Sequence, residues 1–184
     1  MNIILFGLSM SGKTTIGKKI AEKFNRTFID TDLLIERAYG QSTKTHRTCR
    51  QICADEGELF FRELERQQIE SLKGSSKCVI ALGGGSLCNQ ASATFLQSIG
   101  HLIYLKTPAD ILWQRIQMHG TPAYLDQSDP KTSFDKLVKR RIPLFEKMAH
   151  TTIETSHMNE EDIVASLSLI IKAFENLHFE TRSV

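Results

Sequence analysis

The sequence predicts an α/β fold, a three-layer sandwich in which helices cover both faces of a mostly parallel, five-stranded sheet. Three observations predict it. Short apolar runs alternate along the chain with longer segments of helical periodicity. The runs are continuously apolar rather than alternating, which is typical of strands buried on both faces. Glycine-rich or acidic clusters follow several of the runs directly, at the strand ends where such folds bind ligands.

Five apolar segments are the predicted strands, because they are short, rich in β-branched or aromatic residues and bounded by polar clusters. They cover residues 2–6, 27–29, 78–82, 101–105 and 151–153. The last is the shortest and most polar of the five. Together they account for one sheet in one domain, predicted to span residues 1–184.

Helical periodicity fills the intervals between these strands. The predicted helices begin in the glycine loop near residue 13 and after Asp32, and then cover residues 58–72, 91–99, 108–118, 132–149 and 159–175. Pro108 suits the first position of its helix because its missing N–H is not needed there. In the helix over 58–72, the residues expected on or near the buried face are Leu59, Phe60, Leu64 and Ile69. Residues 119–130 are polar and irregular.

Composition excludes several classes of protein. Hydrophobic residues make up 41% and charged residues 24% of the chain, as in ordinary globular domains. A net charge of +2 indicates neither a nucleic-acid nor a membrane surface. The four cysteines lack the spacing of a zinc site, so they are interpreted as free thiols, which favours a cytoplasmic location. We expect a monomer.

The stretch Gly7-Leu8-Ser9-Met10-Ser11-Gly12-Lys13-Thr14 matches the phosphate-loop pattern GxxxxGK[ST] and lies between a predicted strand and a predicted helix. Its backbone N–H groups and the helix N-terminus are suited to the β-phosphate of ATP. Lys13 is predicted to reach the β and γ oxygens, and the Thr14 hydroxyl to complete a Mg²⁺ shell. The predicted ATP-binding residues here are Gly7, Ser9, Met10, Ser11, Gly12, Lys13, Thr14 and Thr15.

Met10 stands where many small kinases carry a second glycine. The pattern leaves this position open. Because a methionine with positive φ is strained, we expect Met10 to keep an ordinary backbone conformation while the loop still closes.

Two motifs that the sequence lacks narrow the choice of molecule that receives the phosphate. No Asn-Lys-x-Asp guanine motif occurs, which argues against a GTPase switch. The strand over 78–82 ends in Gly83-Gly84-Gly85 and not in the acidic residues of a motor ATPase. Glycines there allow a small acceptor molecule to approach the backbone closely, so the sequence favours a small-molecule kinase.

Four motifs then occur in order over residues from about 1 to 155. After the phosphate loop come Asp30-Thr31-Asp32, then Gly57-Glu58-x-x-Phe61-Arg62-x-x-Glu65, Gly83-Gly84-Gly85, and Arg141-x-Pro143-Leu144-Phe145. In this combination the chain resembles the shikimate kinases, members of the nucleoside-monophosphate-kinase-like group of P-loop proteins. The resemblance implies transfer of the ATP γ-phosphate to the 3-hydroxyl of shikimate, a step of aromatic amino acid biosynthesis, with Mg²⁺ as cofactor.

The resemblance also assigns roles. Arg62 and Arg141 match the arginines that hold the shikimate carboxylate, as bidentate donors should. Asp32 matches the aspartate that hydrogen-bonds the ring hydroxyls and assists proton removal. The remaining matches are Asp30 near Mg²⁺ through water, Gly83, Gly84 and Gly85 lining the acceptor pocket, Glu65 orienting Arg62, and Arg115 stacking on adenine.

Structural alternatives stay open for single residues. Arg62 and Glu65 could form an exposed i,i+3 pair, and Arg141 could belong to a solvated basic helix face. Asp30 or Asp32 could be a helix N-cap, and Asp32 could not easily be both cap and ligand.

Two segments depart from the family pattern. The acceptor-binding subregion, about 31–66, contains a stretch from Gly40 to Gly57 that is several residues longer than usual and basic. The lid, about 119–131, carries Thr121 where the family has an arginine that reaches the transferred phosphate. Lys131, Lys136 and Arg115 are candidates for a substitute cation. The alternatives to a shikimate kinase are therefore a gluconate or nucleoside-monophosphate kinase, or a nucleotide-binding protein with weakened catalysis.

Overall fold

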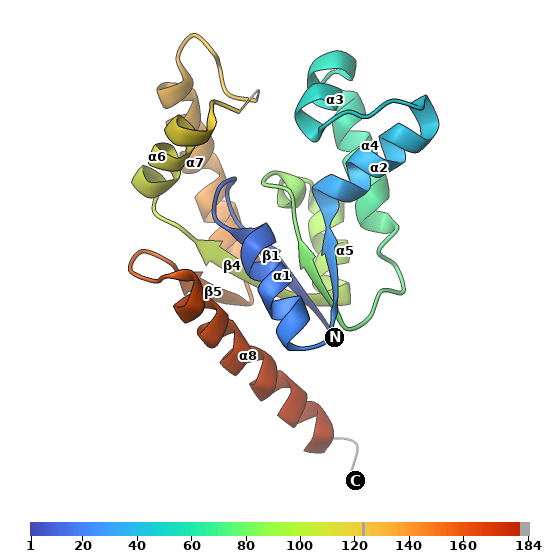
Figure 1. The fold of residues 1–184 in the computed structure, drawn as a ribbon, viewed down its shortest axis with the longest axis vertical. Coiled ribbons are helices and arrows are strands. Elements are labelled where there is room, and N and C mark those ends of the chain that lie inside the picture. The colour runs from blue at the N-terminus through green and yellow to red at the C-terminus, as the bar shows by residue number, and fades with distance from the viewer. Residues whose placement is uncertain (123, 181–184) are drawn as a thin grey trace.

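The computed structural model of the chain describes residues 1–122 and 124–180, with side chains up to residue 176. Ala123, which falls in the predicted lid, and the last four residues lie outside the described residues. Five parallel strands form one sheet in the order β2-β3-β1-β4-β5 (Figure 1). They are β1 (Asn2–Phe6), β2 (Thr27–Asp30), β3 (Cys78–Ala81), β4 (Gly100–Lys106) and β5 (Thr151–Glu154). The predicted five-stranded parallel sheet is confirmed.

The helices connect these strands, and all those predicted are present. They are α1 (Lys13–Lys23), α2 (Thr31–Thr43), α4 (Glu58–Glu70), α5 (Gln90–Ile99), α6 (Ala109–His119), α7 (Pro130–Met148) and α8 (Glu160–Glu180). Two further elements were not predicted, α3 (Cys49–Glu56) and the 3₁₀ turn η1 (Ser86–Cys88). Helix α3 has only eight residues and buries one side chain, Ile52, so it has almost no apolar periodicity. Its sequence signal is instead a capping box between Thr48 and Gln51.

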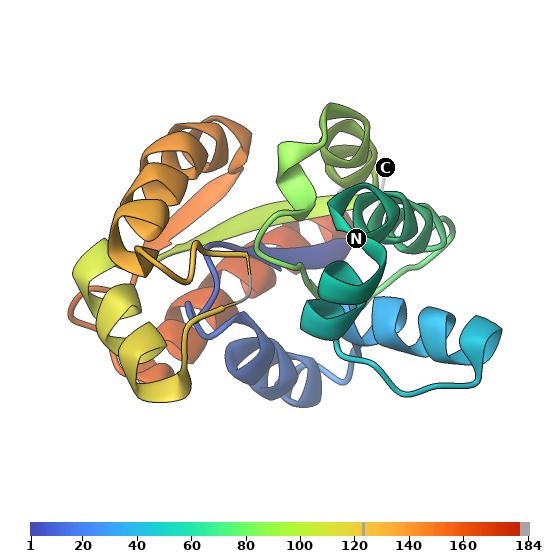
Figure 2. The ribbon, with the colours of Figure 1, turned by 90° about the horizontal axis from the view of Figure 1, so that it is seen from above.

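Helices cover both faces of the sheet (Figure 2), and an apolar layer lies between the sheet and the helices on each face. Because neighbouring side chains of a strand point to opposite faces, Ile4 and Phe6 pack on one face of the sheet, and Ile3 and Leu5 on the other. The first layer is completed by side chains of α4, α5, α6 and α7, and the second by α1 and α8. None of the helices in the described part of the chain is long and apolar enough to cross a membrane.

A third, smaller cluster joins α2, α3 and α4 through Ile35, Tyr39, Ile52 and Phe61. This unit projects above the sheet on one side of the phosphate loop, and α6 with the segment that follows it projects on the other (Figure 1). The subregion predicted to bind the acceptor therefore has a small core of its own.

The buried face predicted for α4 is wrong in part. Leu59 is 90% exposed and Phe60 is 46% exposed, whereas Phe61, Glu65 and Ile69 are buried. These three follow the i, i+4 spacing of one helix face. The residue at the centre of that face, Glu65, is charged. Apolar periodicity alone could not identify it as buried, so Leu59 and Phe60 were wrongly expected on this face.

Candidate active site

Three site motifs lie at the carboxyl edge of the sheet, as parallel strands require. The phosphate loop follows β1, the acidic pair ends β2 and begins α2, and the triple glycine follows β3. These three strands are adjacent, so the motifs are brought together by the strand order alone.

The phosphate loop folds back on itself and opens directly into α1. Gly7 and Gly12 have φ values of 152° and 84°, and Gly12 is the N-cap of the helix. A side chain at Gly7 would place its Cβ 2.7 Å from the Leu105 carbonyl oxygen. The Lys13 Nζ donates to the carbonyl oxygens of Gly7 and Leu8 at 3.1 and 2.9 Å. The lysine is thus held over the concave side of the loop.

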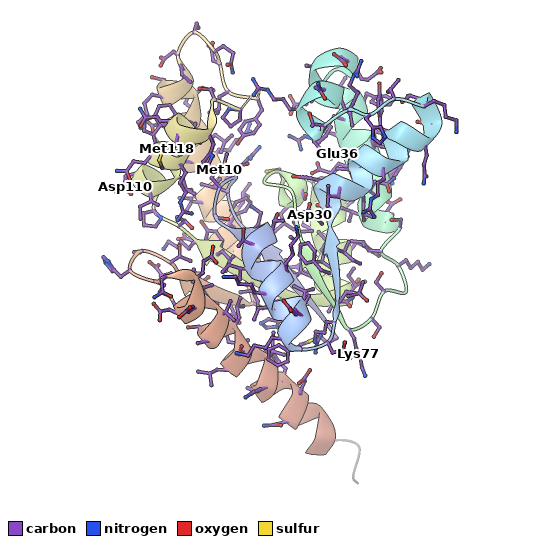
Figure 3. The ribbon with its side chains drawn as sticks, viewed as in Figure 1. Met10, Asp30, Glu36, Lys77, Asp110 and Met118 are labelled. Carbon is purple, nitrogen blue, oxygen red and sulfur yellow. The ribbon has the colours of Figure 1, made fainter. Side chains whose placement is uncertain are left out.

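The prediction that Met10 keeps an ordinary backbone conformation is wrong. The φ of this residue is 68°, so it adopts the left-handed conformation that a glycine would take there. The Arg115 Nη1 donates to the Met10 carbonyl oxygen at 2.7 Å, and Figure 3 shows Met10 on the phosphate loop beside α6. The loop geometry is imposed on the methionine by its surroundings, at a cost of roughly 1–2 kcal/mol.

Around the loop lies a cavity of about 300 Å³ that suits a nucleotide phosphate chain. It is lined by Ser9, Met10, Gly12, Lys13, Thr14, Thr15, Asp30, Asp32, Leu82 and Gly84. Three of the predicted ATP-binding residues do not line this cavity. Gly7 and Ser11 belong to the loop, and Arg115 donates to the loop backbone.

Two oxygen donors suited to a divalent cation lie side by side in this cavity. The Thr14 hydroxyl donates to Asp30 Oδ2 at 2.8 Å, and Asp30 Oδ1 accepts from the Asp32 backbone N–H at 3.0 Å (Figure 3 shows the position of Asp30). Asp30 is therefore the N-cap of α2, which leaves the Asp32 carboxylate free. Hydroxyl and carboxylate oxygens fit Mg²⁺, which keeps most of its waters in proteins. No group of three or more potential metal-ligating side chains occurs among the described residues.

A second cavity of about 250 Å³ adjoins the first, sharing Ser9, Asp32 and Gly84 with it. It brings together the predicted acceptor-binding residues Asp32, Arg62, Gly83, Gly84, Gly85 and Arg141. The residues that the sequence did not select are Cys49, Arg50, Cys53, Ala54, Phe61, Pro122 and Tyr124. Most of these belong to the unpredicted helix α3 or to the lid, where only the capping box and the polar composition gave a signal.

Arg62 is fixed by a buried partner and is not part of a purely exposed pair. Its Nη1 donates to Glu65 Oε2 at 2.8 Å, and the Glu65 side chain is 7% exposed. The other Glu65 oxygen accepts from the Ser86 hydroxyl at 2.8 Å. Glu65 is thereby satisfied on both oxygens and holds Nη1 of the guanidinium. Nη2 makes a longer contact of 3.4 Å with the exposed Glu58, and Arg62 lines the cavity from this position.

Arg141 does not lie on a solvated helix face, because the residue is only 5% exposed. Its Nη1 donates to the Gly84 carbonyl oxygen at 3.0 Å, and its Nε has no hydrogen-bond partner among the described residues. Burial lowers the pKa of Arg141, but a guanidinium remains charged at neutral pH. A buried cation without a carboxylate partner in the described part of the chain, next to Arg62, is suited to an anionic ligand.

The three glycines after β3 leave room for these side chains. A Cβ at Gly83 would lie 2.5 Å from Asp32 Oδ1, and one at Gly85 would lie 2.8 Å from Arg62 Nη1. At Gly84 the obstruction would be the Ser9 hydroxyl, at 2.9 Å. Any larger residue would displace a site side chain, so the glycine run is a packing requirement of the site.

Desolvation also shifts the pKa values of the two groups at the junction of the cavities. The Asp32 residue is exposed in the open junction of the two cavities. Partial desolvation by the surrounding site residues, followed by repulsion from Asp30, raises its pKa to about 6. Burial lowers the pKa of Lys13 to about 8, opposed by the charges of Asp32 and Asp30. Both shifts leave the groups able to gain or lose charge near neutral pH, as is common at functional sites.

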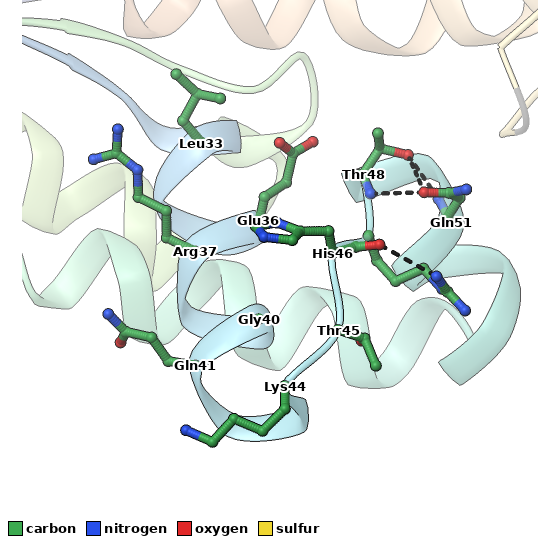
Figure 4. Close-up of a pocket in the computed structure, with 11 residues that line it drawn as sticks. Leu33, Glu36, Arg37, Gly40, Gln41, Lys44, Thr45, His46, Thr48 and Gln51 are labelled. Carbon is green, nitrogen blue, oxygen red and sulfur yellow. Dashed lines mark hydrogen bonds between the residues drawn. The ribbon is translucent and has the colours of Figure 1, made fainter.

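The first part of the Gly40–Gly57 segment lies outside the site, and its second part lines the acceptor cavity. Its residues 44–48 run beside α2 around an open hollow of about 740 Å³ (Figure 4). Helix α3 then begins after its N-cap Thr48, and the Cys49 backbone N–H donates to Glu36 Oε1 at 2.9 Å. Residues 44–48 thus lead into α3, which supplies Cys49 and Cys53 to the acceptor cavity.

Comparison with known proteins points to one family. The shikimate kinase family model matches residues 9–172. A shikimate kinase of Syntrophus aciditrophicus is 33% identical, over 97% of this chain and 93% of its own length. One of Clostridium botulinum is 37% identical, over 95% and 96%. The structure of the Acinetobacter baumannii shikimate kinase in complex with shikimate superimposes with a TM-score of 0.84 at 33% identity, covering 94% of this chain and 93% of that one.

These matches extend over almost the whole chain, including the phosphate loop's last residues, the acceptor cavity and the lid. The resemblance first seen in four short motifs is therefore confirmed along the sheet and its helices. The chain belongs to the shikimate kinase family.

Proposed function

We propose that this protein is an ATP-dependent kinase that transfers the γ-phosphate of ATP to the 3-hydroxyl of shikimate, giving shikimate 3-phosphate in aromatic amino acid biosynthesis. The observation that carries the proposal is the pair of adjoining cavities. One is formed by a phosphate loop. The other is lined by three arginines, of which Arg62 and Arg141 belong to the family motifs, and by the free carboxylate of Asp32. An acceptor that is both a carboxylic acid and a polyol satisfies both kinds of group.

In the acceptor cavity, Arg62 and Arg141 bind the carboxylate of shikimate, and Asp32 accepts hydrogen bonds from its ring hydroxyls. Once ionised, Asp32 is also placed to receive the proton of the attacking hydroxyl, because it lines both cavities. Gly83, Gly84 and Gly85 form the wall against which the ring lies.

In the nucleotide cavity, the loop N–H groups bind the β-phosphate, and Lys13 neutralises charge on the β and γ oxygens. Mg²⁺, when bound, would be held by the Thr14 hydroxyl and, through water, by Asp30, and it neutralises phosphate charge. Arg115, on α6, donates to the Met10 carbonyl oxygen, and this position beside the loop supports its assignment to stacking on adenine. Residues 31–66 act as the acceptor-binding subregion and residues 119–131 as the lid of a single-domain, monomeric, cytoplasmic enzyme.

A substrate panel tests the assignment. ADP release is measured with shikimate, gluconate, AMP and CMP as acceptors at equal concentration. Shikimate alone should be turned over efficiently, because only it presents a carboxylate on a rigid ring of the size of the cavity. Efficient turnover of gluconate or of a nucleotide would contradict the proposal, and ATP binding without turnover of any acceptor would favour a protein with weakened catalysis.

A further inference from the structure

Tyr124 lines the acceptor cavity from the lid, where the family motifs select no residue other than the missing arginine. It lies between α6 and α7, next to Leu125, which is only 2% exposed and packs in the main core. The Leu125 backbone N–H donates to the Pro122 carbonyl oxygen at 3.1 Å, and the Gln127 side chain donates to the same oxygen at 3.0 Å. The C-terminal neighbour of Tyr124 is therefore fixed in the core, and the Pro122 carbonyl oxygen accepts two hydrogen bonds from the residues that follow.

Tyr124 contacts both halves of the site. Its phenol interacts with the side chain of Ser9, which belongs to the phosphate loop and lines both cavities. Its ring lies over the Arg141 guanidinium, with Cζ 6.0 Å from the ring centroid, a distance at which the ring face still attracts a cation. One lid side chain thus reaches the junction of the two cavities and one of the two acceptor-binding arginines.

The protonation state of this phenol fits a hydrogen-bond donor. Tyr124 as a residue is 47% exposed, but desolvation where it lines the cavity raises its pKa, and the Ser9 contact and the charge of Arg141 only partly oppose the rise. The hydroxyl therefore keeps its proton at neutral pH. A neutral donor can contact a phosphate oxygen without the repulsion that an ionised phenol would cause.

Two of the cations considered as substitutes for the lid arginine have other partners. Lys131 pairs with Asp135 and lies 5.5 Å from the centroid of the Trp113 ring. Arg115 donates to the Met10 carbonyl oxygen. Neither lines the acceptor cavity, whereas Tyr124 does.

We propose that Tyr124 is the lid residue that acts in phosphoryl transfer in this protein, an inference that rests on the proposed kinase function. Its hydroxyl donates a hydrogen bond to an oxygen of the γ-phosphoryl group at the junction of the cavities. Its ring shields Arg141 from water and so strengthens the ion pair between that arginine and the acceptor carboxylate. The hydroxyl and the ring have separate effects, one on the transfer step and one on acceptor binding.

The transfer itself leaves Tyr124 unchanged. The acceptor oxygen forms a bond to the γ-phosphorus while the bond from that phosphorus to the β–γ bridging oxygen breaks, and ADP leaves. The proton of the acceptor hydroxyl passes to the Asp32 carboxylate. Tyr124 donates its hydrogen bond throughout and neither gains nor loses a proton.

Two substitutions separate the hydroxyl from the ring. In Tyr124→Phe, kcat should fall about tenfold while the KM for shikimate stays within about twofold of wild type, because one hydrogen bond made in the transition state is lost. In Tyr124→Leu, kcat should fall equally and the KM for shikimate should rise by about tenfold, because Arg141 loses the aromatic ring that lies over its guanidinium. Both variants are checked for folding by circular dichroism.

Tyr39→Phe is the matched control. The Tyr39 hydroxyl donates to Glu56 Oε1 at 2.6 Å, and the residue lines neither cavity. Both its kinetic constants should therefore remain near those of wild type. A wild-type kcat in Tyr124→Phe would overturn the proposal, as would a fall in kcat that Tyr39→Phe reproduces. If wild-type protein fails to phosphorylate shikimate, the proposed function itself is wrong and this inference falls with it.

Discussion

The nucleotide half and the acceptor half of the site are built in different ways. Most of the nucleotide half comes from one continuous stretch, residues 7–15, in a strand–loop–helix unit, and the ends of β2 and β3 complete it. The acceptor half is assembled from side chains of α2, α3, α4, α7 and the lid, together with the backbone of the glycine run. A local motif can therefore specify most of the first half by itself, whereas the second depends on the packing of distant segments. The two halves should accordingly respond to substitution in different ways.

Lys13→Ala should have the largest effect and act on the nucleotide half alone. Turnover should fall by about a thousandfold or more, because Lys13 is the side-chain cation of the phosphate loop and lies in a buried site where charge is weakly screened. Shikimate binding, measured by calorimetry without nucleotide, should be little changed. Lys18→Ala, on the exposed face of α1, is the control and should keep wild-type turnover. Most of the activity surviving in Lys13→Ala would contradict the role of the loop.

Arg62→Ala should act on the acceptor half. Shikimate affinity should fall by about a hundredfold, since a charge-assisted pair is lost and the buried Glu65 loses its partner. ATP affinity should remain near that of wild type, because Arg62 does not line the nucleotide cavity. Titration calorimetry with each ligand measures both.

The matched control for Arg62 is Arg66→Ala, one turn further along α4. Arg66 pairs with Glu63 and Glu70 on the outer side of the helix and does not line the acceptor cavity. Its loss should leave both affinities unchanged. An unaltered shikimate affinity in Arg62→Ala would refute the carboxylate assignment, and equal losses in the two variants would point to a general effect on α4.

The pH dependence of kcat/KM tests Asp32, the carboxylate that lines both cavities. Because the pKa of Asp32 is raised to about 6, kcat/KM for shikimate should fall about tenfold per pH unit below pH 6, where the carboxyl is protonated and can no longer accept the proton. Above that pH the limb should be flat until Lys13, with its pKa of about 8, begins to lose its charge. The profile of initial rates at low shikimate concentration measures both limbs.

Asp32→Asn should affect activity and stability in opposite directions. A carboxyl whose pKa is raised in the folded state binds its proton more tightly there than in the unfolded chain, so stability falls as pH rises from about 4 to 6 and stays lower above that range. The amide that replaces the carboxylate carries no charge, so the melting temperature of the variant at pH 7 should exceed that of wild type while its turnover is largely lost. An acidic limb that persists in this variant would assign the titration to another group.

Met10→Gly should have the smallest effect. The left-handed backbone at residue 10 is strained for methionine and free for glycine, whose greater flexibility when unfolded offsets part of the gain. The free energy of unfolding should therefore rise by about 0.5–1 kcal/mol, measured by denaturant titration. Met118→Gly, in the last turns of α6, should instead lower it. A loss of stability in Met10→Gly would mean that the methionine side chain stabilises the loop by its own contacts.

The same difference between the halves explains what the sequence could predict. The strands, the phosphate loop and the residues of all four motifs could be predicted from local patterns. The structure brings the phosphate loop, the acidic pair and the glycine run together at the carboxyl edge of the sheet, and Arg62 and Arg141 line the same cavity as the glycines. In α4, Ile69 is buried as predicted, whereas Leu59 and Phe60 are exposed. Glu65 was missed because it is buried for its bond to Arg62, and no apolar pattern marks such a residue. Helix α3 and Tyr124 were missed because their places depend on α2, α4 and α7 packing around them. The φ of Met10 likewise depends on its surroundings rather than on its residue type.

The central claim, that the acceptor half recognises a carboxylate through Arg62 and Arg141, is tested most directly by comparing shikimate with its methyl ester as acceptors. The ester keeps the ring and every hydroxyl but carries no charge. For wild-type protein, kcat/KM should be at least about a hundredfold higher with shikimate, the loss expected when a buried cation is left without its anion. Equal values for the two acceptors would contradict the account.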